Sequence, residues 1–248
     1  MKMIKNNFLI ILLSILVLAS CQNDSIRPNV PIGLYENGYF VTNEGNFGTG
    51  NGSLSFIDDR GSVSNNIFAQ TNSFSLGDVV QSMEIINEKA YIVVNNSSKV
   101  EVANIDSMDY ITTIVGLSSP RYILQVSDNK AYVSDWGIGG LQVIDLNTNS
   151  IISTISTGQG PEKMLIKDNK VFVCNVGGFG LDNTISVIDI NSDMLITNII
   201  VGDKPNSIVE DASGGIWVLA GGNTEYDANW NVIAETPGEL TKINNQTN

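Results

Sequence analysis

The sequence predicts an all-β protein, a β-propeller made of four-stranded antiparallel blades. After residue 38, short apolar runs alternate with turns rich in Asn, Asp and Gly. The pattern VFVCN, Gly-rich loop, TISVIDI over residues 171–190 has four further copies. The first strands of the copies begin at Tyr39, Ala90, Ala131, Val171 and Ile216, which are 51, 41, 40 and 45 residues apart. A repeat near 40 residues with about four short strands has the size of a propeller blade.

Residues 1–20 are predicted to be a lipoprotein signal peptide. Lys2 and Lys5 precede an apolar run from Phe8 to Leu18 that is too short for a comfortable membrane span. The run ends in Leu-Ala-Ser followed by Cys21, which resembles a bacterial lipobox. That resemblance implies cleavage before Cys21, lipidation of this residue and a membrane anchor formed by its acyl chains. An ordinary signal peptide with a chance cysteine is the alternative.

Residues 21–38 are predicted to be the lipidated cysteine and a tether. This segment contains Pro28 and Pro31 and has no clear period. A single acidic residue soon after Cys21 hints at export to the outer leaflet, so we expect an outer-membrane lipoprotein exposed at the cell surface.

The charge of the chain argues against nucleic acid as a partner. The formal net charge is −13, and loss of residues 1–20 removes two lysines and no acid, which leaves 11 basic and 26 acidic residues, or −15. Nucleic-acid binding needs a basic footprint, and direct binding to acidic lipid is disfavoured for the same reason. A soluble extracytoplasmic surface is a sufficient explanation of the charge.

The sequences of the third and fourth repeat units each predict four strands. In the third unit we expect strands at Tyr122 to Val126, Ala131 to Asp135, Leu141 to Asp145 and Ile151 to Ser156. In the fourth we expect them at Lys163 to Ile166, Val171 to Asn175, Thr184 to Asp189 and Leu195 to Val201. Clusters of Asn and Asp between them predict hairpin turns, because these residues tolerate positive φ. No stretch after Leu18 has an amphipathic helical period.

The connectors between units carry a family resemblance. TGQGP at Thr157 to Pro161 recurs as VGDKP at Val201 to Pro205 and, more weakly, as VGLSSP at Val115 to Pro120. With YFVTN at Tyr39 to Asn43 and Val-Ile-Asp at residues 187–189, these motifs resemble the YVTN-repeat β-propellers. More narrowly, they resemble the YncE-like and DUF5074-like surface lipoproteins of Bacteroidota. The resemblance covers nearly everything after Gly38, and it specifies a fold rather than a function.

The family resemblance implies a seven-bladed ring, whereas this chain supplies about four and a half blades. The first unit begins at its second strand, and the fifth ends in LTKIN without a fourth strand. Closure of a ring is what removes sheet edges. We therefore expect residues 39–248 to be an incomplete ring from a truncated product or fragment, with a five-bladed ring as the alternative.

Candidate ligand-binding residues lie on loops that the propeller fold places on one face. Turns on the opposite face are tight, whereas these loops are long and Gly-rich, and the last is an insert from Gly221 to Gly238. Loops on a rigid scaffold are where binding residues concentrate, and large aromatics there offer stacking surfaces. The candidates are Glu44, Asn46, Phe47, Arg121, Asp135, Trp136, Phe179, Asp182, Tyr226 and Trp230. The alternative for each aromatic is that it plugs the gap between neighbouring blades.

Arg121 has two readings of equal weight. It follows Pro120 at the start of a first strand and faces the mouth of the central channel. There it can hold an anionic group of a ligand, or it can pair with Glu84 or Glu162.

Catalysis, cofactors and metals find little support in the sequence. The chain has no His, which removes the commonest general base and the Ser-His-Asp arrangement. Cys174 lies inside a strand and is expected to be a buried small residue rather than a nucleophile. Gly177 to Gly180 lacks the Lys and the helix of a phosphate loop. Glu44, Asp135 and Asp182 are not spaced as a calcium loop, so we expect no metal and no cofactor.

These observations favour a binding module without catalytic residues. By resemblance, a surface lipoprotein of this kind captures a nutrient ligand for an outer-membrane transporter, and some relatives capture corrinoids. A protein-interaction scaffold at the cell envelope is the second hypothesis. A hydrolase or lyase that works without His is the third, with Glu44, Asp135 or Asp182 as the residues to test.

Overall fold

The computed structural model describes residues 33–243, so the signal peptide, Cys21 and most of the tether lie outside the described residues. The folded unit begins at Leu34. The Leu34 backbone N–H donates to the Asp106 carbonyl at 3.0 Å, and the ring of Tyr35 lies against those of Phe40 and Phe56. The fold therefore starts five residues before Tyr39, because Tyr35 supplies core surface that the first sheet needs.

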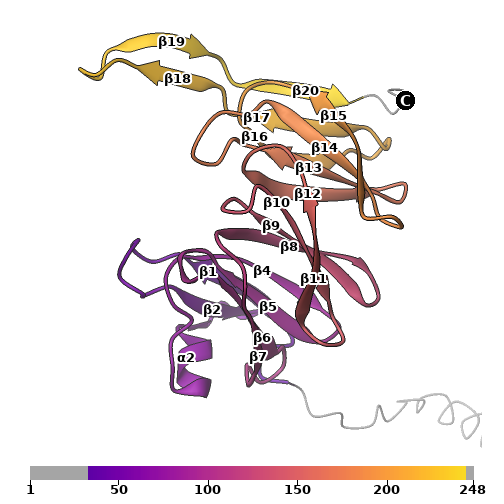
Figure 1. Ribbon diagram of the computed structural model, residues 1–248. Coiled ribbons are helices and arrows are strands. Elements are labelled where there is room, and N and C mark those ends of the chain that lie inside the picture. The colour runs from indigo at the N-terminus through magenta and orange to yellow at the C-terminus, as the bar shows by residue number, and fades with distance from the viewer. Residues whose placement is uncertain (1–32, 244–248) are drawn as a thin grey trace, which may run out of the picture. The chain divides into compact units, whose positions relative to one another are not determined.

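Three complete four-stranded antiparallel blades occupy the middle of the chain (Figure 1). The first contains β4 (Val80–Ile86), β5 (Lys89–Val94), β6 (Lys99–Asn104) and β7 (Tyr110–Ile114). The second contains β8 (Pro120–Ser127), β9 (Lys130–Asp135), β10 (Gly140–Asp145) and β11 (Ser150–Ser156). The third contains β12 (Pro161–Lys167), β13 (Lys170–Asn175), β14 (Thr184–Asp189) and β15 (Met194–Ile200). In each blade the strands pair in sequence order, which confirms the predicted propeller blades.

Two three-stranded sheets flank these blades. The first contains β1 (Gly38–Asn43), β2 (Ser53–Asp58) and β3 (Val63–Ser64). The last contains β16 (Pro205–Glu210), β17 (Ile216–Ala220) and β20 (Glu239–Ile243). Within residues 33–243, no strand precedes β1, and β20 ends at the last described residue.

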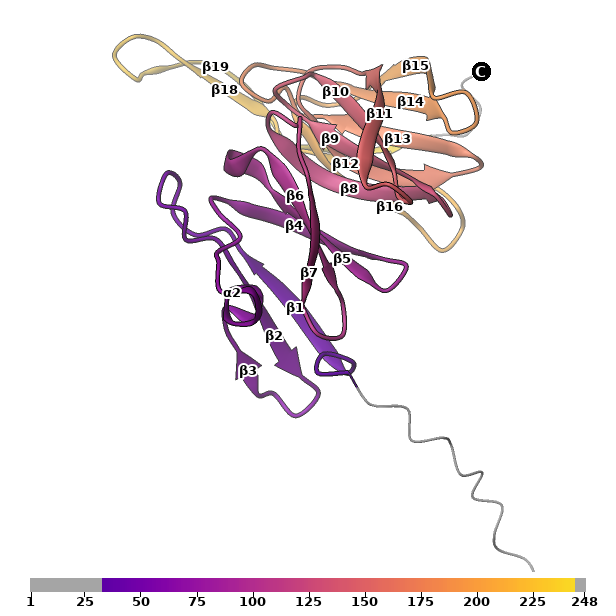
Figure 2. The same ribbon diagram turned by 60° about the horizontal axis from the view of Figure 1, so that its bottom comes forward.

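Three parts of the chain differ from the sequence prediction. Residues Ile67–Asn72 form a helix, α2, and Asn95–Ser97 form a short 3-10 turn, η1, although no helix was expected. Helix α2 is too short to show a period, and its ends are set by Asn66 and Ser73, whose φ angles are 54° and 62°. The insert Gly221 to Gly238 was expected to be a loop, but it forms a hairpin of β18 (Asn223–Tyr226) and β19 (Val232–Thr236), which projects from the last sheet in Figure 2.

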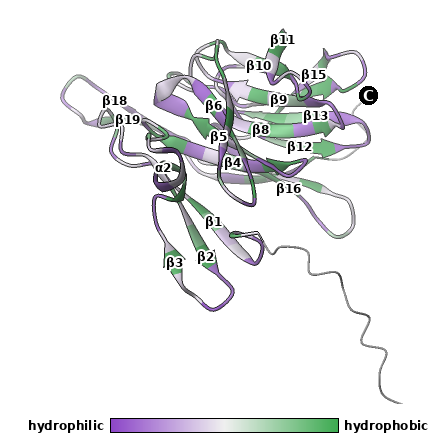
Figure 3. Cartoon of the chain, turned by 90° about the horizontal axis from the view of Figure 1, so that it is seen from below, coloured by the Kyte–Doolittle hydropathy of each residue, from purple (hydrophilic) through white to green (hydrophobic). Residues whose placement is uncertain are grey.

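The hydrophobic core is divided into clusters between successive sheets. In β5, Tyr91 and Val93 pack toward the blade that follows, whereas Ile92 and Val94 pack toward the first sheet. Strand β13 divides its side chains in the same way between the clusters on its two sides. A central strand buried on both faces needs a continuous apolar run, because alternate residues serve opposite neighbours. Figure 3 shows these hydrophobic strands and the hydrophilic turns between them.

Tyrosines in the second strands tie neighbouring blades together. Tyr91 Oη donates to Asn149 Oδ1 at 2.8 Å in the next blade, and Tyr132 donates to Asp193 in the blade after that. Burial, aided by the bond to Asp193, raises the pKa of Tyr132. Each tyrosine thus places a ring in the core and a hydroxyl on a turn of the adjacent sheet.

Candidate functional site

The inner strands β4, β8, β12 and β16 contact one another in sequence order, and each begins with a β-bulge. The bulges contain Gln81, Arg121 with Tyr122, Glu162 with Lys163, and Asn206. A bulge bends its strand and redirects side chains, and bulges are frequent next to functional sites. The local backbone therefore gathers polar side chains from four sheets at one end of the inner strands.

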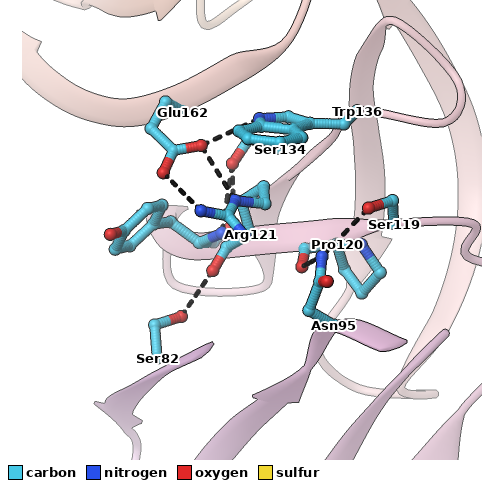
Figure 4. A network of polar contacts seen from close by, with 9 residues as sticks. Ser82, Asn95, Ser119, Pro120, Arg121, Ser134, Trp136 and Glu162 are labelled. Atoms are coloured by element: carbon cyan, nitrogen blue, oxygen red, sulfur yellow. Dashed lines mark hydrogen bonds and ion pairs between the residues drawn. The ribbon is translucent and has the colours of Figure 1, made fainter. Parts of the chain in front are cut away.

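Arg121, Trp136 and Glu162 form a closed cluster at this end (Figure 4). Arg121 donates from Nε and Nη2 to the two carboxylate oxygens of Glu162, both at 2.9 Å. Trp136 Nε1 donates to Glu162 Oε2 at 2.8 Å, and the Arg121 guanidinium carbon lies 4.1 Å from the centre of the Trp136 ring. Bidentate pairing and stacking on an aromatic face both suit the planar guanidinium, so each member fixes the other two.

Neighbouring strands hold the backbone of this cluster in place. Ser82 Oγ donates to the Arg121 carbonyl at 2.7 Å, and Asn95 Nδ2 donates to the Pro120 carbonyl at 3.0 Å. Ser134 Oγ accepts from the Tyr122 N–H at 3.1 Å. These bonds satisfy main-chain groups that the bulge removes from the sheet ladder.

The cluster decides between the two readings of Arg121. Its side chain is 16% exposed and that of Glu162 is 9% exposed, so the charge of Arg121 is matched inside the protein. Breaking a buried pair by removing one partner costs about 3–5 kcal/mol, which disfavours release of Arg121 to an anionic ligand. Arg121 and Trp136 therefore form a rigid wall rather than a free anion receptor.

A hollow of about 180 Å³ lies on the inner strands, and its lining includes Tyr122 and Lys163, the sequence neighbours of Arg121 and Glu162. Its lining comes from all four inner strands: Glu84, Tyr122, Ile123, Leu124, Lys163, Met164 and Ile208. Burial raises the pKa of Glu84. Burial also raises the pKa of Tyr122, and the negative charges of Glu162 and Glu44 add to this, while Arg121 lowers it. The hollow thus combines an apolar floor with one acid, one lysine and one phenol.

Asp135 is a correction to the predicted ligand-binding residues. It is fully buried, and its carboxylate accepts hydrogen bonds from the N–H groups of Ser118 and Ser119, both at 2.8 Å, and Gly137 at 3.0 Å. A carboxylate that holds its own backbone connector has no surface for a ligand. Asp182 is used in a similar way, since it accepts from the N–H groups of Gln159 at 2.7 Å and Thr184 at 2.9 Å.

The predicted aromatic residues form separate pairs rather than one ring. Trp136 and Phe179 meet edge to face with centres 5.9 Å apart, and Tyr226 and Trp230 lie 6.0 Å apart on the β18–β19 hairpin. Among residues 33–243, no ring contact joins these pairs or includes Phe47. Phe179 and Trp230 are 89% and 82% exposed, so neither fills a gap between blades.

The β1–β2 loop supplies the remaining predicted residues, Glu44, Asn46 and Phe47, all of which are exposed. The charge of Glu44 acts on Tyr122, which places Glu44 within electrostatic range of the hollow. Asn46 and Phe47 have no such link to the hollow. The structure therefore connects Glu44, Arg121, Trp136 and Phe179 with this region.

Cys174 is buried, as predicted, and burial raises the pKa of its thiol to about 12. Within the described part of the chain, no group of three or more His, Cys, Asp or Glu side chains could hold a metal ion. None of the helices described between residues 33 and 243 is long and apolar enough to cross a membrane.

The sequence prediction missed Tyr122. It put Lys163 on the loops of the binding face but chose neither Lys163 nor Glu84 as a ligand-binding residue. Alternation along the inner strands was the available signal, because alternate residues of a strand face the same side. It was obscured by the bulges, which put Arg121 and Tyr122 out of register with β9.

Comparisons with solved structures agree with the fold. The chain is similar to hydrazine synthase from Kuenenia stuttgartiensis, with 18% identity and a TM-score of 0.66 over 91% of this chain and 66% of that one. It is also similar to the WD40 β-propeller domain of Doa1, with 14% identity and a TM-score of 0.52 over 67% of this chain and 53% of that one.

A further similar structure is a protein of unknown function from Bacteroides caccae, with 11% identity and a TM-score of 0.52 over 75% of this chain and 74% of that one. The chain thus spans about two thirds of the hydrazine synthase chain and about half of the Doa1 domain. At these identities the likeness shows a propeller fold alone.

No curated protein matches the chain. One family model does match, over residues 37–247, which is nearly the whole of the part that the structure describes. The repeat, the blades and this match agree, and the chain belongs to the propeller-type family described as "Domain of unknown function (DUF5074)".

Proposed function

We propose that this chain is a binding module whose ligand site is the hollow on the inner strands. The convergence of side chains from β4, β8, β12 and β16 on one hollow carries this proposal. The adjacent cluster of Arg121, Trp136 and Glu162 holds the start of β8 and β12 in place, so the strands that line the hollow need little ordering when a ligand binds.

The proposal places this module on the cell surface, where it passes a nutrient ligand to an outer-membrane transporter. The lipobox-like Leu-Ala-Ser-Cys21 and the acidic composition support it. The membrane anchor has a direct test, which is fractionation of cells that produce the full chain or its Cys21→Ser variant. The wild type should sediment with the membrane and the variant should not, and a variant that stays in the membrane fraction would refute lipidation at Cys21.

The ligand site is tested by a thermal-shift screen of small molecules. A ligand that binds only the native state at 100 times its Kd stabilises it by about 2.7 kcal/mol. A hit at the hollow should lose its effect in Tyr122→Phe or Lys163→Ala but keep it in Lys170→Ala, because Lys170 is exposed and lies outside the hollow. A ligand whose thermal shift is unchanged in both Tyr122→Phe and Lys163→Ala would show that the binding site lies outside the hollow.

A protein-interaction scaffold is the second candidate function, and the β18–β19 hairpin favours it. Trp230 is 82% exposed, and its φ of +64° is strained for a bulky residue. Backbone strain at an exposed aromatic is a reason to suspect function. If the scaffold reading is right, Trp230→Gly should abolish binding of a partner protein while the hollow variants leave that binding intact.

A hydrolase or lyase that works without His has weaker support. Such an enzyme needs a carboxylate free to move protons. The carboxylates of Asp135 and Asp182 already accept backbone N–H groups, which leaves Glu44 and Glu84 as the exposed acids at or near the hollow, with no second carboxylate beside Glu84 in its lining. We therefore propose binding without turnover.

A further inference from the structure

We infer that the hollow on the inner strands binds a small extended zwitterion, with its anionic end at Lys163 and its cationic end at Glu84. The chemical class is that of an ω-amino acid or a short linear peptide. This inference rests on the proposed function and names the ligand class of the same site.

Lys163 is an exposed cation without a counter-ion among the described residues. Lys99, Lys130, Lys167 and Lys242 each lie within salt-bridge distance of a carboxylate, whereas Lys163, like Lys89, Lys170 and Lys204, has no such partner among residues 33–243. Of these four unpaired lysines, Lys163 is the one that lines the hollow. Its sequence neighbour Glu162 is already bound by Arg121 and Trp136. The Lys163 ammonium lies 5.9 Å from the centre of the Tyr122 ring and lines the hollow, so an anionic group there would be its first full partner.

Glu84 is the matching anion. No hydrogen bond or ion pair from the described residues reaches its carboxylate, although neighbouring chain displaces enough water to raise its pKa. An ammonium group would favour the ionised carboxylate and offset that cost.

The two charges are held apart by a strand. Glu84 belongs to β4 and Lys163 to β12, and β8, which carries Tyr122, lies between them in contact with both (Figure 1). A ligand that reaches both groups therefore needs its charges at opposite ends. An α-amino acid, whose two charges share one carbon, satisfies one group at a time.

Size and composition limit the ligand further. The hollow holds about 180 Å³, or roughly six waters at about 30 Å³ each, which is below the 300–1,000 Å³ typical of drug-sized sites. Ile123, Leu124, Met164 and Ile208 line the space between the charges and suit an aliphatic linker. The net charge of −13 disfavours ligands with several negative groups.

Isothermal titration of the full chain at low salt tests this inference with 6-aminohexanoate as the probe. Its matched comparisons are hexanoate and hexylamine, which lack one charge each, and L-norleucine, an isomer with both charges on one carbon. We expect 6-aminohexanoate to bind at least about tenfold tighter than all three, because each mismatch leaves a charged side chain unpaired.

Variants of the two charged residues show which residue binds the carboxylate of 6-aminohexanoate and which binds its ammonium group. Lys163→Ala and Glu84→Gln should each weaken binding of 6-aminohexanoate about tenfold or more. Glu88→Gln and Lys170→Ala should leave it unchanged, since these two residues are exposed, as Glu84 and Lys163 are, but lie outside the hollow. The double exchange Glu84→Lys with Lys163→Glu should restore binding with the ligand reversed.

Three results would overturn the inference. Hexanoate that binds as tightly as 6-aminohexanoate would make Lys163 a simple anion site. Non-additive effects of Glu84→Gln and Lys163→Ala on the free energy of unfolding would show that the two residues pair with each other. No heat with 6-aminohexanoate, together with a thermal-shift hit that depends on Tyr122, would reject the zwitterion and keep the binding module, whereas no hit of any kind would reject both.

Discussion

Many Asp side chains in this chain bind its own backbone. Asp135 holds the connector before β8, Asp182 holds the connector before β12, and Asp211 holds the turn between β16 and β17. Each carboxylate accepts several N–H groups that no strand partner can satisfy. A connector can therefore be short and polar without leaving buried donors unpaired.

Asp135→Asn should lower the free energy of unfolding by about 2–3 kcal/mol. Hydrogen bonds to charged acceptors contribute about 1.5–3 kcal/mol each, and the amide keeps one acceptor oxygen while it turns its NH₂ group toward backbone donors. Urea denaturation measures the effect, with Asp168→Asn in an exposed turn as the matched control that changes little. Equal stability of the two variants would contradict the role of Asp135.

Asp211 should make the free energy of unfolding depend on pH in the acidic range. The Ser213 hydroxyl, the Trp217 indole N–H and the Gly215 N–H hydrogen-bond to this carboxylate and hold its pKa well below the ordinary value. Its folded pKa lies below the unfolded value of about 3.9, so the stabilisation is present above that pH and is lost as pH falls below it. Asp211→Asn should therefore flatten the fall of the unfolding free energy below about pH 4, measured by urea denaturation. A fall as steep as that of the wild type would reject this role.

At the scale of elements, the connector before β12 is fitted tightly to the β13–β14 loop. Gly160 has a φ of +60°, and a Cβ there would lie 2.0 Å from the Gly178 nitrogen. The Gly160 carbonyl accepts the Val176 N–H at 2.9 Å, so the connector and the loop that carries Phe179 move together. A larger side chain at Gly160 would clash with the backbone of that loop.

Gly160→Ala should cost about 3 kcal/mol, from about 1–2 kcal/mol for a left-handed residue with a Cβ and the rest from the backbone clash. Gly139→Ala isolates the first contribution, because Gly139 has a φ of +67° and open space where its Cβ would lie. It should cost about 1 kcal/mol. Thermal or urea unfolding compares the two, and equal costs would show that the contact between connector and loop carries no energy.

The sequence was sufficient to predict the regular parts of the blades. The edges of β13 and β14 fell within one residue of expectation, because apolar runs and Asp-Asn turns mark both ends. The hairpin β18–β19 was not predicted, although Asp227 and Asn229 lie in its turn, because its strands NTEY and VIAET are short and β18 is mostly polar. Helix α2 was not predicted because six residues are too few to show a helical period.

The candidate site was less predictable than the fold. Arg121 and Glu162 were recognisable as a possible pair, but two other partners for Arg121 were equally consistent with the sequence. The pairing is decided by bulges in β8 and β12, which depend on connectors in both blades. The buried role of Asp135 was hidden for the same reason, since a sequence does not show which backbone N–H groups lack a partner.

For the molecule as a whole, the row of sheets leaves exposed apolar residues at its first and last members. Within residues 33–243, β1 pairs only with β2, and Tyr39 is 73% exposed. A hollow of about 340 Å³ is lined by β1 and by Met83 and Ile85 of β4. In the last sheet, Leu240 of β20 is 61% exposed. Exposed edges of this kind are templates for pairing with another chain.

A polypeptide of this sequence should therefore self-associate, and the association should increase with salt. The net charge of −13 keeps copies apart, but the Debye length falls from about 10 Å at 0.1 M to about 3 Å at 1 M ionic strength. Val41→Lys together with Leu240→Lys should lower the association at every salt concentration, because a charge on an edge strand opposes pairing. The free energy of unfolding should change by less than about 0.5 kcal/mol, since both side chains are on the surface. Sedimentation velocity across protein and salt concentrations measures the association, and a wild-type chain that stays monomeric at 1 M salt would contradict the prediction.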